Sequence, residues 1–234
     1  IAQSRLLEAA FKTGFEKVLL EYEPVAAALS YERRLKDKEV ILVFDFGGGT
    51  LDFTVMQVGD PRSRQVLATG GIAIGGDIFD QRLFRAAVPR HLGEGEYFVA
   101  GGQQYPIPAH IFDLLTTPQE VVALNTPQYQ DLLRSIHAGA LNKTKTHALL
   151  ELISSNYALL MFDQIERAKR QLSSEGDTPL NFQTETFSIE DTLTRKQFER
   201  AIQKEYEAIL ASMMDTIERS GVKVQEIQRC SRAC

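Results

Sequence analysis

Cysteine is nearly absent from the 234-residue chain, which has only Cys230 and Cys234 at its C-terminal end. Two cysteines so placed cannot form a disulfide framework, and we expect a reducing, cytoplasmic setting. No apolar run approaches the roughly 18 to 20 residues that span a bilayer, so we expect no membrane partner. The net charge of −5, without a strongly basic stretch, argues against nucleic acid as a partner. The four histidines lack a metal-ligand spacing such as HExxH, which argues against a zinc site.

The chain also begins without methionine and without a signal peptide. Its first residues, IAQSRLLEAAFKTGF, have an amphipathic helical pattern that Gly14 is placed to end. We interpret this start as a cut end, so we expect the sequence to be a piece of a longer protein. Its length suffices for one large domain or two small ones with a sizeable core.

The first half of the chain alternates short helical and strand patterns. Residues 16–22, EKVLLEY, predict a short buried strand, and Pro24 suits the first turn of the helix that follows. Three further strands are predicted close together, at 39–46, 50–58 and 64–69. The glycine-studded segment TGGIAIGGD then leads into a helix that begins near Asp77.

The second half is predicted to be mainly helical. Clustered prolines over 89–130 predict loops and short elements, and the proline-free stretch 144–172 has a helical pattern. Residues 179–189, PLNFQTETFSI, alternate as a strand does. A last long helix has Phe198 and Ile217 on one apolar face and ends before Gly221. This order of strands and helices predicts an α/β or mixed α+β fold.

The segment VFDFGGGTLDFTV, residues 43–55, interrupts a strand pattern with three glycines between two acidic residues. Glycine lets the chain turn sharply and, lacking a side chain, lets an anion approach the backbone amides. Asp45 and Asp52 cannot bind phosphate directly, because like charges repel, but they can hold a magnesium ion through water. Thr50 adds a hydroxyl donor. The segment therefore predicts a hairpin that binds phosphate and magnesium.

Three other interpretations of this segment are weaker. A P-loop would need GxxxxGK[ST] followed by a helix, and no lysine follows the glycines here. The letters Asp45-Phe46-Gly47 match a kinase DFG motif, but no HRD loop precedes them. A plain hairpin turn also uses glycine, yet it rarely needs three glycines with an acid on each side.

The same segment resembles the second phosphate motif of the seventy-kilodalton heat-shock chaperones (DnaK-like), members of the actin-like ATPase superfamily. Four more segments resemble that family in the same order along the chain: LLEYEPVAAALSYE, IGGDIFDQRL, ERAKRQLSS and LTRKQFERAI. The resemblance spans most of the chain. It implies an α/β, actin-like ATPase (ribonuclease-H-like) fold, of which this chain would form part of the second lobe.

The resemblance implies a role for each matching residue. Glu23, Asp45 and Asp52 are the implied catalytic residues: Glu23 would lie by the metal and the attacking water, and the two aspartates would hold magnesium through water. The implied contacts to ATP or ADP are Gly47, Gly48, Gly49, Thr50, Gly75, Gly76, Glu166, Lys169, Arg170 and Ser173. The first four would bind the phosphates, the next two would pass close to the nucleotide, and the last four would bind ribose and adenine.

The implied adenosine contacts satisfy one geometric condition. Glu166, Lys169, Arg170 and Ser173 are spaced i, i+3, i+4 and i+7, so they share one face of a helix. Any solvated helix also shows such pairs of acid and base, so the spacing alone favours a routine surface face. It is the resemblance that favours adenosine.

The resemblance also implies a division into subdomains. Residues 1–36 would be the tail of lobe I and its crossing helix, 37–74 with 188–234 the large subdomain of lobe II, and 75–187 the small outer subdomain. Two features depart from the family pattern. Tyr22 and Val25 replace polar residues around Glu-Pro, and the stretch between Gly76 and Glu166 is unusually long. Both indicate a divergent, bacterial-type relative.

The implied function is that of a heat-shock-type molecular chaperone, which binds and hydrolyses Mg-ATP when it is complete. The family pattern includes an earlier phosphate hairpin, a catalytic lysine and a later glycine-rich segment, none of which this sequence contains. We therefore expect the chain alone to turn over ATP weakly or not at all. The implied partners are ATP and co-chaperones or exchange factors, whereas client polypeptides would bind only through a further domain.

Two alternatives stay open. A stand-alone lobe could bind nucleotide or a partner without turnover, and its partner would then bind equally well with ATP, ADP or neither. A sugar or metabolite kinase of the same superfamily shares a DxGGxx-type hairpin but would need a substrate aspartate and a sugar cleft. The segment ERAKRQLSS favours the chaperone over the kinase and over cell-shape filament proteins.

Overall fold

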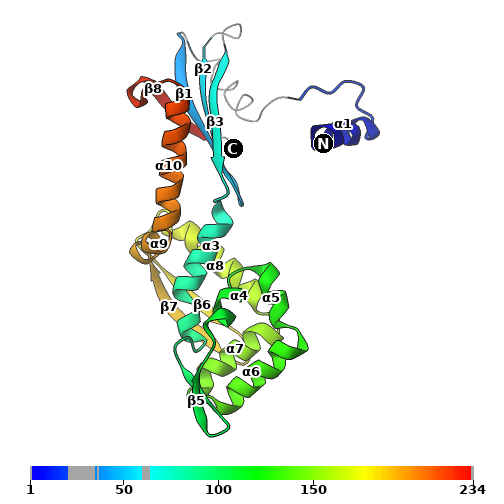
Figure 1. The fold of residues 1–234 in the computed structure, drawn as a ribbon, viewed down its shortest axis with the longest axis vertical. Coiled ribbons are helices and arrows are strands. Elements are labelled where there is room, and N and C mark those ends of the chain that lie inside the picture. Colours follow the sequence, from blue (N-terminus) through cyan, green and yellow to red (C-terminus); the bar gives the residue numbers. More distant parts are fainter. Residues whose placement is uncertain (1, 21–34, 36, 60–63, 233–234) are drawn as a thin grey trace. The chain divides into compact units, whose positions relative to one another are not determined.

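The computed structural model describes residues 2–20, 35, 37–59 and 64–232 of the chain (Figure 1). Contacts divide the chain into two compact units, one of Ile1–Ala73 with Ala211–Cys234 and one of Ile74–Leu210. Strands and helices occur in both, which confirms the predicted mixed α/β class. Residues 188–210 belong to the second unit, and the division into subdomains of a lobe stays a prediction. Among the described residues no helix is both long and apolar enough to cross a membrane.

The first unit contains a four-stranded mixed sheet in the order β3-β2-β1-β8 (Figure 1). Its strands are β1 (Glu39–Phe46), β2 (Leu51–Val58), β3 (Gln65–Ile72) and β8 (Ile227–Arg232). The first three are antiparallel neighbours, whereas β8 runs parallel to β1. Helix α1 (Ala2–Lys12) and the 3-10 helix η2 (Val224–Glu226) complete the unit together with the end of α10 (Gln203–Arg219). The three strands predicted between 39 and 69 are confirmed.

Apolar side chains are buried on both faces of this sheet. One face carries a buried cluster of Ile41, Val43, Met56 and Val58. Gly70, which pairs with Phe53 in the ladder, lies on the other face, since successive strand residues alternate. A Cβ atom at Gly70 would lie 2.0 Å from the hydroxyl oxygen of Thr216, so this glycine permits the close approach of α10.

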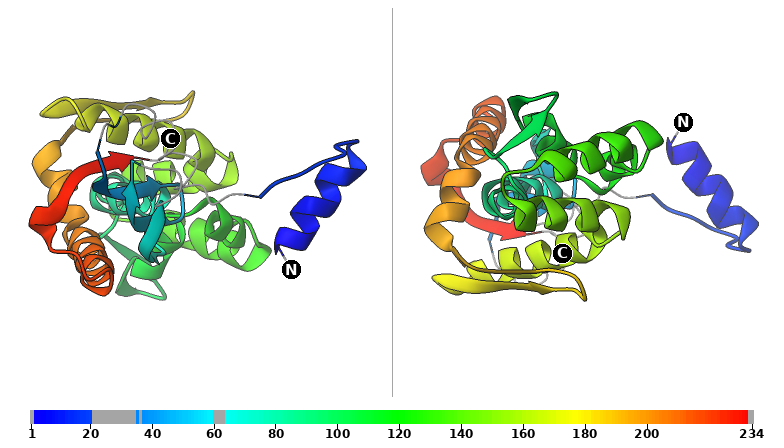
Figure 2. Two further views of the ribbon diagram at one scale, coloured as in Figure 1. Left: turned by 90° about the horizontal axis from the view of Figure 1, so that it is seen from above. Right: turned by 90° about the horizontal axis from the view of Figure 1, so that it is seen from below.

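The second unit combines helices with the antiparallel strand pairs β4–β5 and β6–β7. Its elements are α3 (Gly76–Ala87), η1 (Pro89–His91), β4 (Tyr97–Ala100), β5 (Gln103–Pro106), α4 (Ala109–Leu114), α5 (Pro118–Leu124), α6 (Pro127–Gly139), α7 (Lys143–Ser154), α8 (Ala158–Leu172), β6 (Asp177–Gln183), β7 (Ser188–Thr194), α9 (Arg195–Ala201) and the start of α10. Helices α6 and α7 lie side by side (Figure 2). The helix expected near Asp77 and the short elements expected over 89–130 are confirmed.

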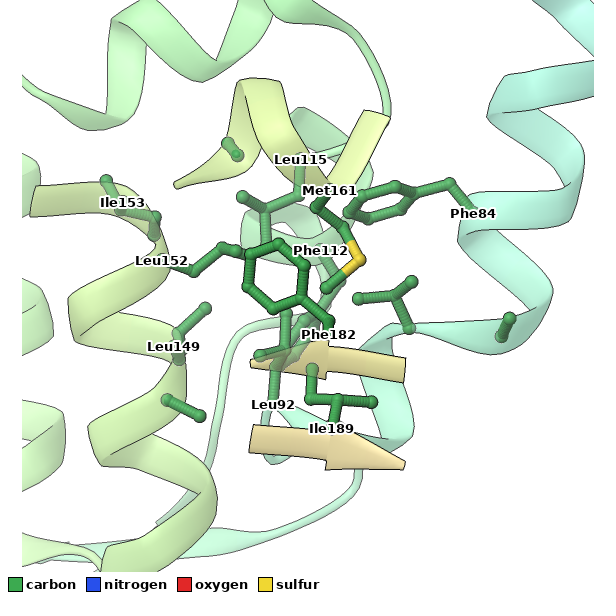
Figure 3. Packing of buried hydrophobic residues seen from close by; sticks show 14 of the residues in the cluster. Phe84, Leu92, Phe112, Leu115, Leu149, Leu152, Ile153, Met161, Phe182 and Ile189 are labelled. Carbon is green, nitrogen blue, oxygen red and sulfur yellow. The ribbon is translucent and has the colours of Figure 1, made fainter. Parts of the chain in front are cut away.

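The core of the second unit forms where helices meet the β6–β7 pair. Figure 3 shows Phe84 of α3, Phe112 of α4 and Met161 of α8 converging with Phe182 of β6 and Leu149 of α7. All five are at most 4% exposed. Burying a side chain of this size stabilises the folded state by about 1.5–3 kcal/mol, so this cluster fixes α3 and α8 against each other.

The strand predicted at 16–22 is wrong over the residues that the structure describes. Residues 16–20 have no strand hydrogen bonding, and Leu19 is 84% exposed. A short apolar run becomes a strand only where a neighbouring strand accepts its hydrogen bonds. Residues 21 and 22, and Pro24 with its predicted helix, lie outside the described residues.

The single strand predicted at 179–189 is also wrong, because the segment turns back on itself. It contains the end of β6, a turn at Thr184–Phe187 and the start of β7. The amide of Thr184 donates to the Phe187 carbonyl oxygen at 2.9 Å, and the Thr184 hydroxyl accepts the Phe187 amide at 3.0 Å. A threonine hydroxyl thus forms a turn without glycine, proline or asparagine, which is why the alternation concealed it.

The helical pattern predicted over 144–172 is confirmed. The stretch forms α7 and α8, separated at Asn156, whose φ of 56° lies in the left-handed region. The last predicted helix forms α9 and α10, separated at Ile202, where φ is −100° and ψ is 7°. The predicted end before Gly221 is confirmed, since α10 ends at Arg219 and Gly221 has a φ of 72°.

Candidate functional site

The glycine segment forms the turn between β1 and β2, and the ladder register places Asp45 directly opposite Asp52. Because side chains alternate along a strand, both carboxylates lie on the face that carries Ile41 and Met56. The Gly47 amide donates to the Thr50 carbonyl oxygen at 2.9 Å and closes the turn. Asp45 is half-buried, whereas Asp52 and the turn are exposed. The turn therefore presents two acids side by side at its base.

The carboxylate of Asp52 is held from two sides. The Thr50 hydroxyl donates to its Oδ2 at 3.2 Å. Gly71 of β3 lies opposite Asp52 in the ladder, and a Cβ atom there would lie 2.5 Å from Asp52 Oδ1. Any larger residue at position 71 would displace the carboxylate. The sequence prediction missed Gly71, although two consecutive glycines within a strand indicate a close approach of other atoms.

The facing acids fit a hydrated divalent cation. Like charges directly opposite each other on neighbouring strands destabilise a sheet, and neither carboxylate has an ion-pair partner among the described residues. Magnesium is bound by one or two carboxylates and keeps several of its waters. Within the described part of the chain no group of three or more histidine, cysteine or acidic residues could hold a metal. Asp45 and Asp52 could thus hold magnesium with water as the remaining ligands.

Two of the three turn glycines, Gly47 and Gly49, are not required by the fold itself. Neither Gly47 nor Gly49 adopts a left-handed φ, and a Cβ atom at Gly49 would meet no atom within 4 Å. At Gly47 the nearest atom would be the Thr50 carbonyl oxygen at 3.5 Å, an ordinary contact. The missing side chains leave open space beside exposed amides, which is what an approaching phosphate needs.

The second unit carries the other predicted nucleotide contacts. Gly75 is buried and precedes α3, which begins at Gly76. On α8, Glu166 forms an ion pair with Arg170 at 2.5 Å, and the Ser173 hydroxyl donates to the Lys169 carbonyl oxygen at 3.3 Å. Arg170 is 75% exposed, so its pair with Glu166 alone would be routine for a solvated helix.

Lys169 differs from its neighbours on α8, because its ammonium group reaches α3. It donates to Asp80 Oδ2 at 2.6 Å and to the Gly76 carbonyl oxygen at 3.1 Å. The structure therefore brings together Gly76 and Lys169, two residues predicted to contact the nucleotide. Asp80 was missed by the sequence prediction, although it follows Gly76 by one helical turn and so shares its face of α3.

The carboxylate of Asp80 lies in an acidic pocket. Burial raises its pKa above the usual value, and the hydrogen bond from Lys169 opposes that shift. The pocket has a volume of about 350 Å³, and its acidic lining comes from α3 and α8: Asp77, Asp80, Asp163 and Glu166. Glu166 thus faces a concave surface.

The predicted site residues therefore fall into two described sets and one that is not described. Asp45, Asp52 and Thr50 come together with the glycine turn in the first unit. Gly76 and Lys169 come together in the second unit. Glu23 lies outside the described residues.

Comparison with known proteins identifies the family. The family model described as Hsp70 protein matches residues 3–92 and 134–231. The chain is 44% identical over 70 residues to a chaperone protein dnaK of Emiliania huxleyi, covering 30% of this chain and 11% of that protein. A chaperone protein DnaK of Thermosipho africanus is 44% identical over 77 residues, covering 32% of this chain and 13% of that protein. A stromal 70 kDa heat shock-related chloroplast protein of Spinacia oleracea is 44% identical over 70 residues, covering 30% and 12%.

The matched stretches are short compared with these relatives, of which they cover between 11% and 13%. The family match is far broader within this chain, since it includes both hairpin strands, α3, α8 and α10. It omits 93–133, which contains β4, β5, α4, α5 and the start of α6. On this evidence the chain belongs to the Hsp70 family.

Proposed function

We propose that the chain forms part of the nucleotide-binding domain of a heat-shock chaperone and binds Mg-ATP there. The observation that supports this most strongly is the pair of facing carboxylates, Asp45 and Asp52, at the base of an exposed glycine turn. In fold terms, we propose that this region belongs to the second lobe of an actin-like ATPase. Hydrolysis of ATP is proposed for the complete protein.

The residues of the turn would bind the phosphate end of the nucleotide. Transfer of a phosphoryl group to water depends mainly on positioning and on neutralising charge. Magnesium, when bound, supplies charge that neutralises the phosphates. Asp45 and Asp52 would hold its waters, and the amides of Gly48 and Gly49 would donate to phosphate oxygens. Gly47, whose amide already donates to the Thr50 carbonyl oxygen, would leave room for the phosphate, and the Thr50 hydroxyl would exchange Asp52 for a phosphate oxygen. Glu23 would orient the attacking water.

The second unit would bind the nucleoside end. Gly75 and Gly76 would let the nucleotide pass close to the backbone at the start of α3. Glu166, Lys169, Arg170 and Ser173 would contact ribose and adenine from one face of α8. The concave pocket supports the contact of Glu166 alone, because none of the other proposed nucleoside contacts lines it.

A direct test is to titrate residues 1–234 with ADP by calorimetry, once with magnesium and once with EDTA. We expect tighter binding with magnesium. Asp45→Asn should weaken binding about tenfold with magnesium, the effect of losing one charged contact, and leave binding in EDTA unchanged.

The matched control is Asp177→Asn, which removes an exposed carboxylate from β6 in the second unit. It should leave ADP binding unchanged under both conditions. Equal losses in the two variants, or ADP binding that is independent of magnesium in the unmodified chain, would contradict the assignment of Asp45.

Co-chaperones or exchange factors and client polypeptides are proposed partners of the complete protein. Residues 93–133 are relevant to partner binding, because the family match leaves them out. They include four complete elements of the second unit. Any partner surface built from this segment would be particular to this chain and its near relatives.

A further inference from the structure

The ammonium group of Lys169 is fixed between two groups of α3. It donates to Asp80 Oδ2 at 2.6 Å and to the Gly76 carbonyl oxygen at 3.1 Å. The Lys169 side chain is 18% exposed and that of Asp80 is 21% exposed, so this is a largely buried ion pair. Gly76 and Asp80 are spaced i and i+4, which places both acceptors on one face of the helix. A single lysine thus ties the last turn of α8 to the first turns of α3.

The pair is not an obvious source of stability. Asp80 Oδ1 is buried and has no hydrogen-bond partner in the part of the chain that the structure describes. A buried carboxylate oxygen without a partner costs free energy, and an apolar pair of similar volume would often be at least as stable. An arrangement of this kind therefore calls for an explanation other than packing.

We propose that Asp80 is a positioning residue, which orients Lys169 and neutralises its charge for the nucleoside contact proposed above. This inference rests on the proposed function and deepens it. A paired ammonium exerts a much weaker field on a distant anion than an isolated one does. It keeps a third N–H, which can donate to a ribose hydroxyl or a ring nitrogen.

The positioning can be tested without any nucleotide. Acetylation of Lys169 by a water-soluble N-hydroxysuccinimide ester is followed by mass spectrometry in the folded chain. Asp80→Asn should raise the acetylation rate of Lys169 several-fold, because the ammonium loses its charged anchor. Lys145, which pairs with Glu96, is an internal reference whose rate should stay constant.

The matched control for this test is Asp163→Asn. Asp163 lines the same acidic pocket on α8 but pairs with Arg167 instead of Lys169. The control should leave the Lys169 rate unchanged. An unchanged Lys169 rate in Asp80→Asn would overturn the positioning role.

The choice between nucleoside and phosphate is tested by titrating each variant with adenosine and with ADP. If Lys169 contacts the nucleoside, Asp80→Asn should lower the affinity for adenosine and the affinity for ADP by a similar factor, about tenfold. If Lys169 contacts phosphate, unmasking its charge should raise the affinity for ADP and leave the affinity for adenosine unchanged. That result would overturn the proposal.

Asp80→Glu keeps the charge but moves the carboxylate by one methylene group. Asp80→Glu should restore part of the affinity for adenosine and ADP that Asp80→Asn loses. It is also the variant to use if Asp80→Asn unfolds. Equal affinities of Asp80→Glu and the unmodified chain would show that position 80 needs only a charge. If the unmodified chain binds neither ligand, the proposed function and the nucleoside contact both fail, while the acetylation rates still decide whether Asp80 positions Lys169.

Discussion

Two antiparallel hairpins in this chain differ in how their turns are made. The β6–β7 hairpin closes through Thr184, whose hydroxyl and backbone satisfy the turn from within. The β1–β2 hairpin closes through glycines that leave open space and exposed amides, above two facing acids. The first arrangement serves folding, since local hydrogen bonds complete the turn. The second leaves two facing carboxylates without a basic partner among the described residues, which is the feature that supports a proposed binding role.

The charges of the two hairpins differ in the same way. On β7, Asp191 accepts hydrogen bonds from both Arg90 and His91, the latter at 2.7 Å. On the β1–β2 hairpin, Asp45 and Asp52 face each other without a basic partner among the described residues. A paired acid is part of the folded structure, whereas the proposed role of the facing acids is to bind a cation.

The largest effect is expected from Thr184→Ala. This change removes the hydroxyl that accepts the Phe187 amide at 3.0 Å and the Thr186 amide at 3.2 Å. Losing a turn or cap of this type lowers the free energy of unfolding by about 1–2 kcal/mol. Urea denaturation measures it. Thr186→Ala, next in the same turn and exposed, is the control, and an equal loss there would mean that the Thr184 hydroxyl does not close the turn.

A smaller loss is expected from Asp191→Asn, about 1 kcal/mol at pH 7, because Arg90 is half exposed and solvent screens its charge. Burial raises the pKa of Asp191. The hydrogen bonds from His91 and Arg90 lower that pKa by more than burial raises it, so the net shift is downward. The folded state therefore binds fewer protons than the unfolded state, and this stabilisation exists above the unfolded pKa of about 3.8.

This contribution must disappear on acidification. As the pH falls through the folded pKa of Asp191, the stability of the unmodified chain should approach that of Asp191→Asn. Urea midpoints at a series of pH values from 7 to 3 measure the convergence. Asp131→Asn, which removes an exposed partner of Arg134, is the control at pH 7 for the loss of a surface carboxylate and should change the urea midpoint less than Asp191→Asn does. A constant difference between the unmodified chain and Asp191→Asn across this range would contradict the pairing.

An effect of opposite sign is expected from Asp52→Asn. Removing one of two facing like charges should raise the free energy of unfolding by about 0.5 kcal/mol at low salt, and the gain should shrink as salt screens the repulsion. Thermal denaturation in magnesium-free buffer measures it. Asp177→Asn, on a hairpin strand opposite Thr194, lacks this repulsion and should give no gain. A loss of stability in Asp52→Asn would mean that the acids do not repel each other.

The smallest effect on stability is expected from Gly49→Ala. The added Cβ would meet no atom within 4 Å and φ is not left-handed, so the free energy of unfolding should change by less than about 0.5 kcal/mol. Binding of Mg-ADP should nevertheless weaken, because the methyl group occupies the space beside the amides. Unchanged binding would mean that the open space serves no ligand.

Gly71→Ala is the contrasting variant, since its Cβ would lie 2.5 Å from Asp52 Oδ1. It should lower stability more than Gly49→Ala does, in the same urea series. If the two alanines behaved alike, the close contact between Gly71 and Asp52 would be absent in solution.

The strands from 39 to 69 were predicted because apolar and β-branched residues concentrate in them, and α3 because Gly76 and Asp77 begin a clear helical pattern. The segment at 16–20 failed, because an apolar run does not reveal whether a partner strand exists. The turn at Thr184 was missed, since its hydrogen bonds come from a side chain that is equally common within strands.

The glycine turn, the two acids beside it and the family were predictable from the amino-acid sequence, because each depends on residues that are neighbours along the chain. The contact of Gly71 with Asp52, and the hydrogen bonds that hold Lys169 beside Asp80 and Gly76, depend on the three-dimensional fold. Asp80 and Lys169 are 89 residues apart, and their contact depends on how α3 and α8 pack. Local propensity acts over a few residues, whereas such contacts arise only when a shared core fixes both helices.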